Sequence, residues 1–417
     1  MAKRVNKKRI LIYSLVFSPD GVSTAYLYND LVLGFKNKGY DISVLTSTPH
    51  YNLTKESLEK QPLKKRFFGF LYNSFFNGIK VYHIPLKKYK NPVIRILSFI
   101  YWHISTFIIG LFLKSPDIIL TPSPPLTNGL FAILLAKIKG SKSIYNVQEI
   151  YPDLLIDLGY LKNGFVIKLL KKIEGLVYNM SDAVTTIDNQ FHTIINSRIK
   201  KKDNLLLIPN FVDSDLYSTK SSVFLPQEFK KKEGYTDMVY AGNIGLAQDW
   251  DLIINLAKEI KDFKITIWIV GEGIKKDYVQ SEIKKYKLNN LKLLPYYDRK
   301  FMPAINLFAD IHYIAMNKKV EKYGFPSKVY TIMASAKPMI VVSSEDTPIV
   351  SFLKDITAAM LITDHSLSKL KKGLLKLHNS VELRNKLGSN GRQEIIKKYS
   401  KRVVINQYLR LFNKLSK

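Results

Sequence analysis

The chain has 417 residues, 46% of them hydrophobic, and is therefore long enough for two domains that each bury a core. Its 64 Lys and Arg outnumber its 34 Asp and Glu, and the formal net charge of +30 favours an anionic partner, such as a nucleic acid, an anionic membrane surface or a phosphorylated substrate. The absence of cysteine excludes disulfides, thiolate metal sites and cysteine nucleophiles.

An apolar run at residues 10–17 follows a basic segment, as the apolar region of a signal peptide does. The run is short, however, and a Gly-containing loop and an amphipathic helix follow it. This order is typical of the first strand of an α/β domain, which we expect over residues 9–16, with a helix over 23–38. Further strands are expected at 42–46, 80–84, 117–121, 143–147, 183–187 and 205–208, and further helices from 126 to about 139 and over 164–179.

Residues 96–113, ILSFIYWHISTFIIGLFL, carry no charged side chain and are just long enough to cross a membrane. Tyr101 and Trp102 lie in the middle of this segment, whereas membrane aromatic residues gather at the two ends of a span. Arg95 and Lys87 precede the segment. We expect an interfacial or partly buried amphipathic helix, with a wholly buried helix and a true membrane span as the alternatives.

The periodic pattern is lost over residues 214–236, a polar and charged stretch that we expect to be a linker. Strands and helices then alternate again, which favours a second α/β domain with a parallel sheet. The strands expected here are 238–241, 264–270, 291–294, 311–315, 339–342 and 359–362, and the end of the chain, 390–415, is expected to be largely helical.

Ligands of open parallel sheets bind at the carboxyl ends of the strands, so the strand-to-helix turns are the places where chemistry is expected. Glycines in such turns let the backbone approach a ligand, and the N–H groups at the following helix start favour an anion. Two turns of the second domain contain glycines, and a third turn adds a cation. The residues concerned are Gly242, Asn243 and Gly245, then Gly271, Glu272 and Gly273, and then Ser327 and Lys328.

These three turns predict a phosphate-binding cleft. None of them is a dinucleotide fingerprint, and the chain contains no G-x-x-x-x-G-K-[ST] motif, which argues against ordinary NAD enzymes and P-loop ATPases. Lys328 introduces an expected helix that has no acidic residue from Val329 to Lys337.

Two carboxylates of the first half, Glu149 and Asp153 in NVQEIYPD, come just after an expected strand. Asp153 follows Pro152 and is most simply a helix or turn cap. The functional alternative is a carboxylate that faces a cleft between the domains. The seven histidines are scattered without the paired spacing of metal ligands, so no metal site is expected.

Several short motifs follow one another in a characteristic order along nearly the whole chain. They are SPDG after the first strand, TPSPPL, VQEIYPDLL with LGYLKNG, IPNFVD, YAGNIGLAQ, VGEG, GFPSKVYTIMASAKP and GSNGR. In order and spacing they resemble the glycosyltransferases of the GT-B fold, family 4. The resemblance is strongest to the bacterial subset similar to N-acetyl-L-fucosamine transferases of surface polysaccharide assembly, such as O-antigen or capsule.

The resemblance implies an α/β fold of the GT-B type, with two facing Rossmann-like domains and a C-terminal helix that crosses back to the first. Residues 1–213 would form a membrane-facing acceptor domain and residues 237–395 a nucleotide-sugar domain, joined by the linker 214–236. Residues 396–417 would form the returning helix.

The resemblance also implies a retaining transfer of a sugar from a nucleotide sugar to a polyprenyl-diphosphate-linked saccharide. The donor would be a UDP-sugar such as UDP-N-acetylfucosamine, and no metal or other cofactor would be needed. The protein would be cytoplasmic and peripherally attached to the anionic inner face of the membrane. The donor would be held by Gly242, Asn243, Gly245, Gly271, Glu272, Gly273, Ser327 and Lys328, and the catalytic candidates are Lys328, Glu321, Asp153 and Glu149.

Two departures from the family pattern affect the expected site. Many relatives carry an Arg and a Lys where this chain has Asn243 and approximately Asp249, which leaves Lys328 as the obvious cation. Many also carry two glutamates with seven residues between them, and their places fall here near Tyr323 and on Thr331. Glu321 is therefore expected to be a displaced sugar ligand, with a solvated loop residue as the alternative.

Two other functions remain open at this point. A GT-B-like UDP-sugar 2-epimerase would share the architecture but would transfer its sugar to no acceptor. A basic nucleic-acid-binding protein would explain the charge, although the basic residues are dispersed and no known DNA- or RNA-binding motif is present.

Overall fold

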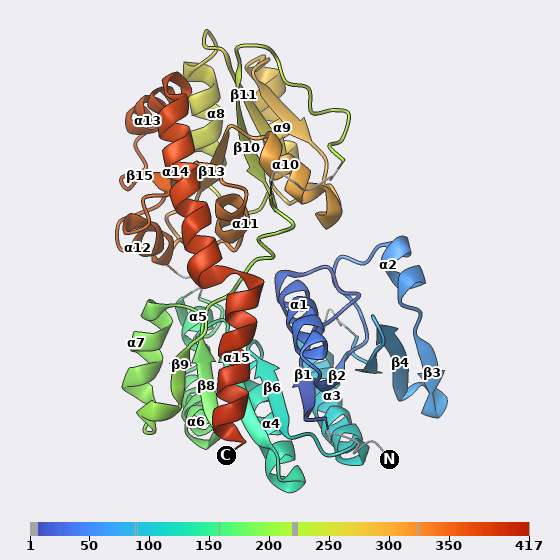
Figure 1. The fold of residues 1–417 in the computed structure, drawn as a ribbon. Helices are drawn as coiled ribbons and strands as arrows, with labels where there is room; N and C mark the ends of the chain where they lie inside the picture. Colours follow the sequence, from blue (N-terminus) through green and yellow to red (C-terminus); the bar gives the residue numbers. More distant parts are fainter. Residues whose placement is uncertain are drawn as a thin grey trace, which may run out of the picture. The chain divides into compact units, whose positions relative to one another are not determined.

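The computed structural model describes residues 7–87, 89, 91–157, 159–218, 224–322 and 325–416. The chain folds into two compact units, one formed by residues 1–210 with 404–417 and the other by residues 211–403. Each unit is built on its own twisted sheet with helices on both faces (Figure 1). The predicted α/β class with two mainly parallel sheets is confirmed. Tyr323 lies outside the described residues.

The sheet of the first unit has the strand order β3-β4-β5-β2-β1-β6-β7-β8-β9 within the described residues. Seven of these strands run parallel, with Ile10 of β1 opposite both Ile42 of β2 and Ile118 of β6. The bounds are β1 (Arg9–Tyr13), β2 (Asp41–Ser47), β3 (Lys64–Arg66), β4 (Leu71–Phe76), β5 (Ile79–Ile84), β6 (Ile118–Pro122), β7 (Lys142–Val147), β8 (Ala183–Thr186) and β9 (Leu205–Leu207).

The antiparallel hairpin of β3 and β4 was not expected from the sequence. β3 consists of three exposed cationic residues and has no apolar alternation that would mark a strand. It exists because the edge of β4 offers it free backbone groups, which is a property of the tertiary structure.

The helices of the first unit include one at the C-terminus of the chain, α15. Its Phe412 packs edge-to-face on Phe35 of α1, with the ring centroids 5.0 Å apart. Gly34 of α1 permits this approach, because a Cβ there would lie 2.0 Å from the side chain of Ile405. The bounds are α1 (Ser23–Asn37), α2 (Lys55–Lys60), η1 (Phe67–Gly69), α3 (Pro92–Phe112), α4 (Leu126–Lys139), α5 (Asp153–Asp157), α6 (Gly164–Met180), α7 (Asn189–Arg198), η2 (Lys202–Asn204) and α15 (Lys401–Leu415).

Helix α3 contains the apolar segment singled out in the sequence. Asn91 caps it by accepting hydrogen bonds from the backbone N–H groups of Val93 and Ile94. By length and composition alone, Val93–Phe112 could cross a membrane, yet in the structure the helix packs along β2, β5 and α4. Only 22% of the span is buried, so the alternative of a wholly buried helix is wrong.

The second unit has a six-stranded parallel sheet in the order β12-β11-β10-β13-β14-β15 within the described residues. Its β11, ITIWIV, is apolar except for Thr266, because helices cover both faces of the sheet. The strands are β10 (Thr236–Ala241), β11 (Ile265–Val270), β12 (Leu291–Leu294), β13 (Ile311–Ala315), β14 (Met339–Val342) and β15 (Ala359–Ile362). The helices are α8 (Trp250–Glu259), α9 (Lys276–Lys285), η3 (Arg299–Phe301), α10 (Met302–Phe308), α11 (Lys328–Ala334), α12 (Pro348–Lys354), α13 (Leu367–Asn379), α14 (Val381–Glu394) and the π-helical turn η4 (Ile395–Tyr399).

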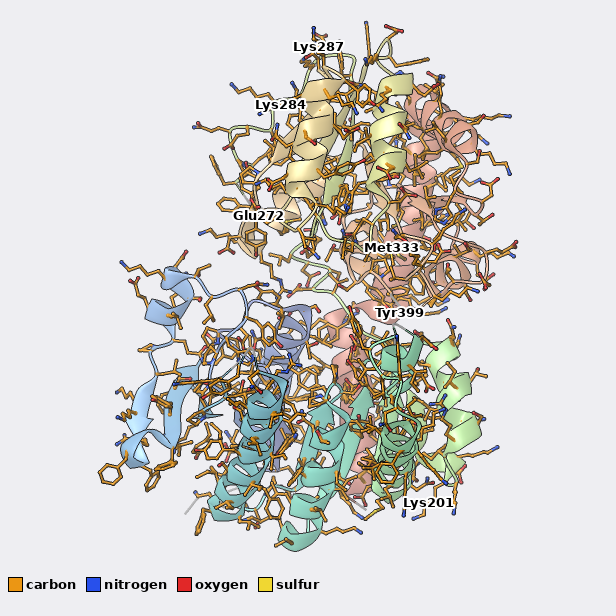
Figure 2. All side chains as sticks on the ribbon, turned by 180° about the vertical axis from the view of Figure 1, so that it is seen from behind. Lys201, Glu272, Lys284, Lys287, Met333 and Tyr399 are labelled. Carbon is orange, nitrogen blue, oxygen red and sulfur yellow. The ribbon has the colours of Figure 1, made fainter. Side chains whose placement is uncertain are left out.

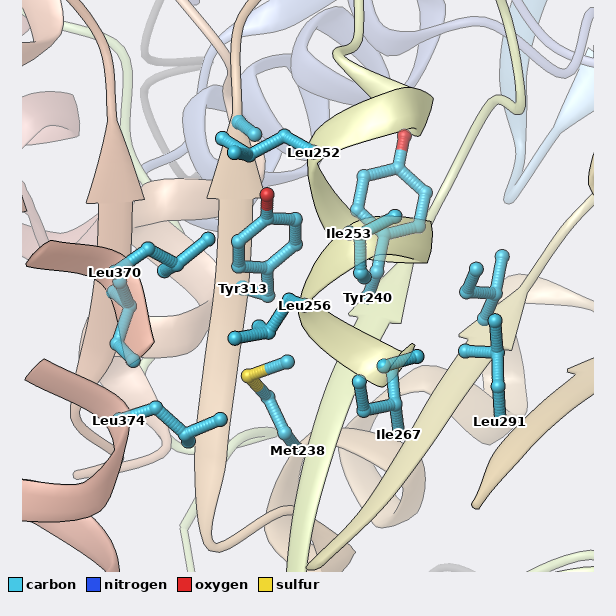
Figure 3. Packing of buried hydrophobic residues seen from close by; sticks show 14 of the residues in the cluster. Met238, Tyr240, Leu252, Ile253, Leu256, Ile267, Leu291, Tyr313, Leu370 and Leu374 are labelled. Carbon is cyan, nitrogen blue, oxygen red and sulfur yellow. The ribbon is translucent and has the colours of Figure 1, made fainter. Parts of the chain in front are cut away.

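The core of the second unit lies between β10 and α8 (Figure 3). Met238 of β10 faces Leu256 of α8, and both side chains are fully buried. Burying an aliphatic side chain of this size contributes about 1.5–3 kcal/mol. The core therefore holds β10 firmly, and with it the turn that starts at Gly242.

The end of the chain is largely helical, as expected, but one break interrupts it. η4 ends at Tyr399, and Ser400 takes an extended conformation and forms a parallel bridge with Val212. The backbone N–H of Val212 donates to the carbonyl of Tyr399, and that of Lys401 donates to the carbonyl of Val212. Pairing with this distant segment breaks the helix.

Candidate functional site

The glycine-containing turns after β10 and β11 are joined by backbone hydrogen bonds. The N–H of Gly242 donates to the carbonyl of Val270 at 2.9 Å, and the N–H of Ile244 donates to the carbonyl of Glu272 at 2.8 Å. The two turns therefore form one surface at the carboxyl ends of the central strands, where ligands of parallel sheets bind.

This contact explains two of the glycines. Gly271 and Gly273 have φ values of +154° and +156°, a region open essentially to glycine alone. A Cβ on Gly271 would lie 1.9 Å from the carbonyl oxygen of Gly242, and one on Gly273 would lie 2.3 Å from that of Ile244. Both glycines are required by the packing of one turn on the other, whatever ligand the turns bind.

Two aromatic side chains form hydrogen bonds with the backbone of the turn that follows β10. The Tyr240 hydroxyl donates to the carbonyl of Asn243 at 2.6 Å, and the Trp250 indole N–H donates to the carbonyl of Gly245 at 2.7 Å. The rings of Tyr240 and Trp250 pack edge-to-face, with their centroids 5.0 Å apart. The turn is therefore held rigid by two buried side chains.

Lys328, the first residue of α11, reaches this turn. Its Nζ lies 3.8 Å from the centroid of the Tyr240 ring, and a Cβ on Gly242 would meet it at 2.6 Å. Although part of the side chain stays exposed, the ammonium group is enclosed, and this burial lowers the pKa of Lys328 to about 7. No carboxylate pairs with it in the part of the chain that the structure describes. An anion at the turn would supply the missing partner.

The other predicted donor residues are less enclosed. Ser327 is exposed and precedes α11 without a side-chain capping hydrogen bond. Glu272 is more than half exposed and forms an i,i+4 ion pair with Lys276. The geometry brings Gly242, Asn243 and Lys328 together, whereas Glu272 lies on the solvent side of the second turn (Figure 2).

Glu321 is buried and saturated with hydrogen bonds from the protein, so the solvated-loop alternative is wrong. Its carboxylate accepts from the Ser343 hydroxyl at 3.0 Å, from the N–H and hydroxyl of Ser344, and from His365 Nε2 at 3.0 Å. Burial raises the pKa of Glu321, but these hydrogen bonds outweigh it and hold the pKa below its usual range. In this structure Glu321 joins three loops, and its role towards a sugar stays a prediction.

The sequence analysis did not single out His365, which follows β15. Its Nε2 donates to Glu321, and its Nδ1 lies 3.8 Å from a carboxylate oxygen of Asp249, the N-cap of α8. His365 has a φ of +56°, unusual for a residue other than glycine. No sequence signal could have found it, because its partners lie tens of residues away.

Glu149 follows β7 in the first unit and is half-buried. Burial raises the pKa of Glu149 above its usual range. A hydrogen bond from Tyr151 lowers this pKa, but its effect is smaller. A partly buried carboxyl group with a raised pKa suits a group that exchanges a proton in a reaction.

Asp153 is engaged in an ion-pair cluster. It is the first residue of α5, and it pairs with Arg198 and, at 3.4 Å, with Lys171. Its role as a helix or turn cap stays a prediction. Arg198 also binds the buried Glu174 at 2.8 Å. The contacts of Asp153 are those of a carboxylate that ties α5 to α6 and α7.

Asp20 of the SPDG motif is a second residue that the sequence analysis passed over. Its buried carboxylate accepts from the N–H groups of His50 and Tyr51 at 2.8 and 2.7 Å. Burial raises the pKa of Asp20 in spite of these bonds. The SPDG motif therefore anchors the loop that carries His50. Among the described residues, no group of three or more His, Asp or Glu could hold a metal ion.

Comparisons with known proteins agree with this architecture. Residues 223–394 match the family model described as glycosyl transferases group 1. The chain is 23% identical over 403 residues to the putative colanic acid biosynthesis glycosyl transferase WcaI of Escherichia coli, covering 89% of this chain and 94% of the relative.

Two solved structures share the fold across nearly the whole chain. A sucrose-phosphate synthase from Thermosynechococcus elongatus superposes with a TM-score of 0.71 at 12% identity, covering 98% of this chain and 99% of the other. The HepE protein of Anabaena in complex with UDP gives a TM-score of 0.69 at 12% identity, covering 98% and 100%. The protein is therefore a glycosyltransferase of the GT-B fold, and its residues 223–394 match the glycosyl transferases group 1 family.

Proposed function

We propose that the protein transfers a sugar from a UDP-sugar to a saccharide carried on a polyprenyl diphosphate, with retention of the anomeric configuration, in bacterial surface polysaccharide synthesis. UDP-N-acetylfucosamine is the candidate donor. The observation that carries the proposal is the position of Lys328, a cation without a carboxylate partner among the described residues, above the turn at Gly242.

The chemistry of the donor explains why such a cation is useful. When the bond between the sugar C1 and the diphosphate oxygen breaks, negative charge develops on the leaving UDP. A cation placed beside that oxygen stabilises the charge without a metal ion. Because an anion favours the protonated amine, a bound diphosphate would raise the pKa of Lys328 from about 7, so that it is charged when it is needed.

Two similar proteins support the proposed donor and the proposed class of pathway. The HepE structure holds UDP, and the relative from Escherichia coli is described as acting in colanic acid biosynthesis. On the acceptor side, Glu149, with its raised pKa, is our candidate for handling the proton of the attacking hydroxyl.

A ligand screen by thermal denaturation tests the donor assignment. UDP present at about 100 times its Kd should add roughly 2.7 kcal/mol to the stability of the protein, whereas GDP and NAD should add little. Stabilisation by GDP but not by UDP would overturn the donor class. Incubation with UDP-sugar alone, followed by sugar analysis, separates the alternatives, because a 2-epimerase would convert the donor without an acceptor.

A further inference from the structure

Helix α3 is apolar on both sides, whereas a helix on the surface of a soluble protein has a polar outer side. Its inner side packs Trp102, Phe107 and Leu111 into the core, beside the buried His103 and Thr106. Its outer side carries exposed apolar residues at intervals of three or four, as on one face of a helix. The exposed apolar residues of α3 are Val93, Ile94, Ile96, Leu97, Ile100, Tyr101, Ile104, Ile108 and Phe112.

Two polar side chains of α3, Thr106 and His103, form hydrogen bonds inside the protein. The Thr106 hydroxyl donates to the carbonyl of Trp102 at 2.6 Å, and His103 Nε2 bonds the Thr127 hydroxyl at 2.8 Å while its ring stacks on Phe131. Burial lowers the pKa of His103 to about 4, so it is neutral at physiological pH. The polar residues that dilute the hydropathy of α3 therefore do not make its outer face suited to water.

The exposed apolar surface continues onto α4 and α6. Helix α4 packs against α3 on one side and α6 on the other, and together they cover one face of the first sheet (Figure 2). Lys139 of α4 ties the layer together by donating to the carbonyls of Leu111 and Leu113, at 2.5 and 2.8 Å. The further exposed apolar residues are Leu134 and Ile138 of α4 and Phe165, Val166, Leu169 and Leu176 of α6.

The charge of this surface, which we call the α3–α4–α6 face, has one sign. The three helices contain a single acidic residue, Glu174, which is buried and paired with Arg198. Their basic residues are Arg95, Lys137, Lys139, Lys168, Lys171 and Lys172. A second copy of the same face would bring like charges together, which disfavours self-association.

We propose that the α3–α4–α6 face docks in the plane of an anionic lipid bilayer. The apolar side chains would enter the boundary between headgroups and acyl chains, and the cations would contact lipid phosphates. α3 would lie in the membrane surface without crossing it, because its other side is packed against β2 and β5. This surface belongs to the first unit, so the proposal goes beyond donor binding and does not depend on it.

Vesicle co-sedimentation of the full chain tests the proposal, with vesicles of phosphatidylcholine alone and with about a third phosphatidylglycerol. The protein should bind the anionic vesicles at low salt and be released at high salt. The variant Ile100→Ser/Ile104→Ser and the variant Lys168→Glu/Lys172→Glu should each lower the partition coefficient about tenfold or more.

Matched controls come from the second unit. The charge control is Lys372→Glu/Lys376→Glu on the exposed side of α13, which changes the net charge as much as Lys168→Glu/Lys172→Glu does and at the same i,i+4 spacing. The apolar control is Val381→Ser/Ile396→Ser, which replaces two residues about as exposed as Ile100 and Ile104. Both controls should bind vesicles like the unaltered protein. Unchanged thermal stabilisation by UDP would show that every variant is folded, and it would separate a failure of docking from a failure of the donor assignment.

Three results would overturn the proposal. The first is equal loss of vesicle binding in the control variants. The second is resistance of the membrane-bound protein to alkaline carbonate extraction, which would indicate a true span. The third is a dimer in solution that Ile100→Ser/Ile104→Ser converts to a monomer, which would assign the face to a second copy of the chain.

Discussion

The ammonium nitrogen of Lys328 lies 3.8 Å from the centre of the Tyr240 ring, and the same tyrosine donates through its hydroxyl to the carbonyl of Asn243. One buried aromatic side chain therefore positions both the cation and the turn expected to bind the donor. The ring attracts the cation only weakly, by about 0.5–2 kcal/mol, and cannot replace a negatively charged partner.

Replacing Lys328 by methionine should abolish sugar transfer and the thermal stabilisation by UDP, because it removes the cation while keeping the length of the side chain. Lys337→Met is the matched control. Lys337 is another half-buried lysine, and burial lowers its pKa too. Its charged neighbours include Asp310, which lies just before β13, at the amino ends of the strands and therefore away from the turn at Gly242. Transfer at an unaltered rate by Lys328→Met would contradict the assignment of this cation.

The lowered pKa of Lys328 also predicts how stability depends on pH. In the folded protein the amine titrates at about 7 instead of 10.5, so between these values the unfolded chain binds more protons. Stability should therefore rise with pH across this window, and the cost of burying the charge should be largest below pH 7. Ligand-free Lys328→Met should melt at least about 2 °C above the unaltered protein at pH 6, with a smaller difference at pH 9. Equal melting temperatures at pH 6 would show that the amine is not desolvated.

Gly271→Ala should destabilise the second unit by about 3 kcal/mol and abolish UDP binding, because the added Cβ would overlap the carbonyl of Gly242. Gly234→Ala is the control, since Gly234 also has a positive φ but its surroundings leave room for a Cβ. That control should cost only about 1 kcal/mol. Urea unfolding measures the free energy of unfolding of both variants. Equal losses of stability would mean that a glycine is needed at position 271 for its backbone conformation and not for the contact between the two turns.

Glu321→Gln should reduce stability by about 1.5–3 kcal/mol at pH 7, since it removes charge-assisted hydrogen bonds to Ser343, Ser344 and His365. The folded pKa of Glu321 is depressed, so its contribution is present above the unfolded value of 4.5 and is lost as the pH falls through the folded pKa. The gap between variant and unaltered protein should therefore close on acidification. Glu345→Gln, at an exposed ion pair with Lys354, should change little. If the difference in stability between Glu321→Gln and the unaltered protein did not change with pH, these hydrogen bonds would not be the cause of the lowered pKa of Glu321.

Glu149 and Asp153 should behave differently when each is replaced by its amide. Glu149→Gln should lower the transfer rate by about 10²-fold or more and keep UDP binding, because it removes a proton-exchanging group. Asp153→Asn should cost about 1–2 kcal/mol of stability through Arg198 and leave the rate of the folded enzyme nearly unchanged. Parallel measurement of transfer and urea unfolding distinguishes them, and an inactive but fully stable Asp153→Asn would make Asp153 a catalytic candidate again.

The sequence alone determined the class of fold and the location of the two glycine-containing turns after β10 and β11. Alternating apolar runs and helical patterns predicted most strands, because a strand covered on both faces is nearly continuously apolar, as β11 is apart from Thr266. The glycines after β10 and β11 marked the turns, since only glycine adopts their backbone conformation.

Only the tertiary structure decided what each polar residue contacts. Glu321, Ser343 and His365 lie far apart in the chain and meet because β13, β14 and β15 are neighbours in one sheet. For the same reason, the sequence did not determine which side of α3 packs against the protein. Which side of a helix is covered depends on the sheet beneath it. Here the sheet covers the side with Trp102 and His103 and leaves the equally apolar side with Ile100 and Ile104 exposed.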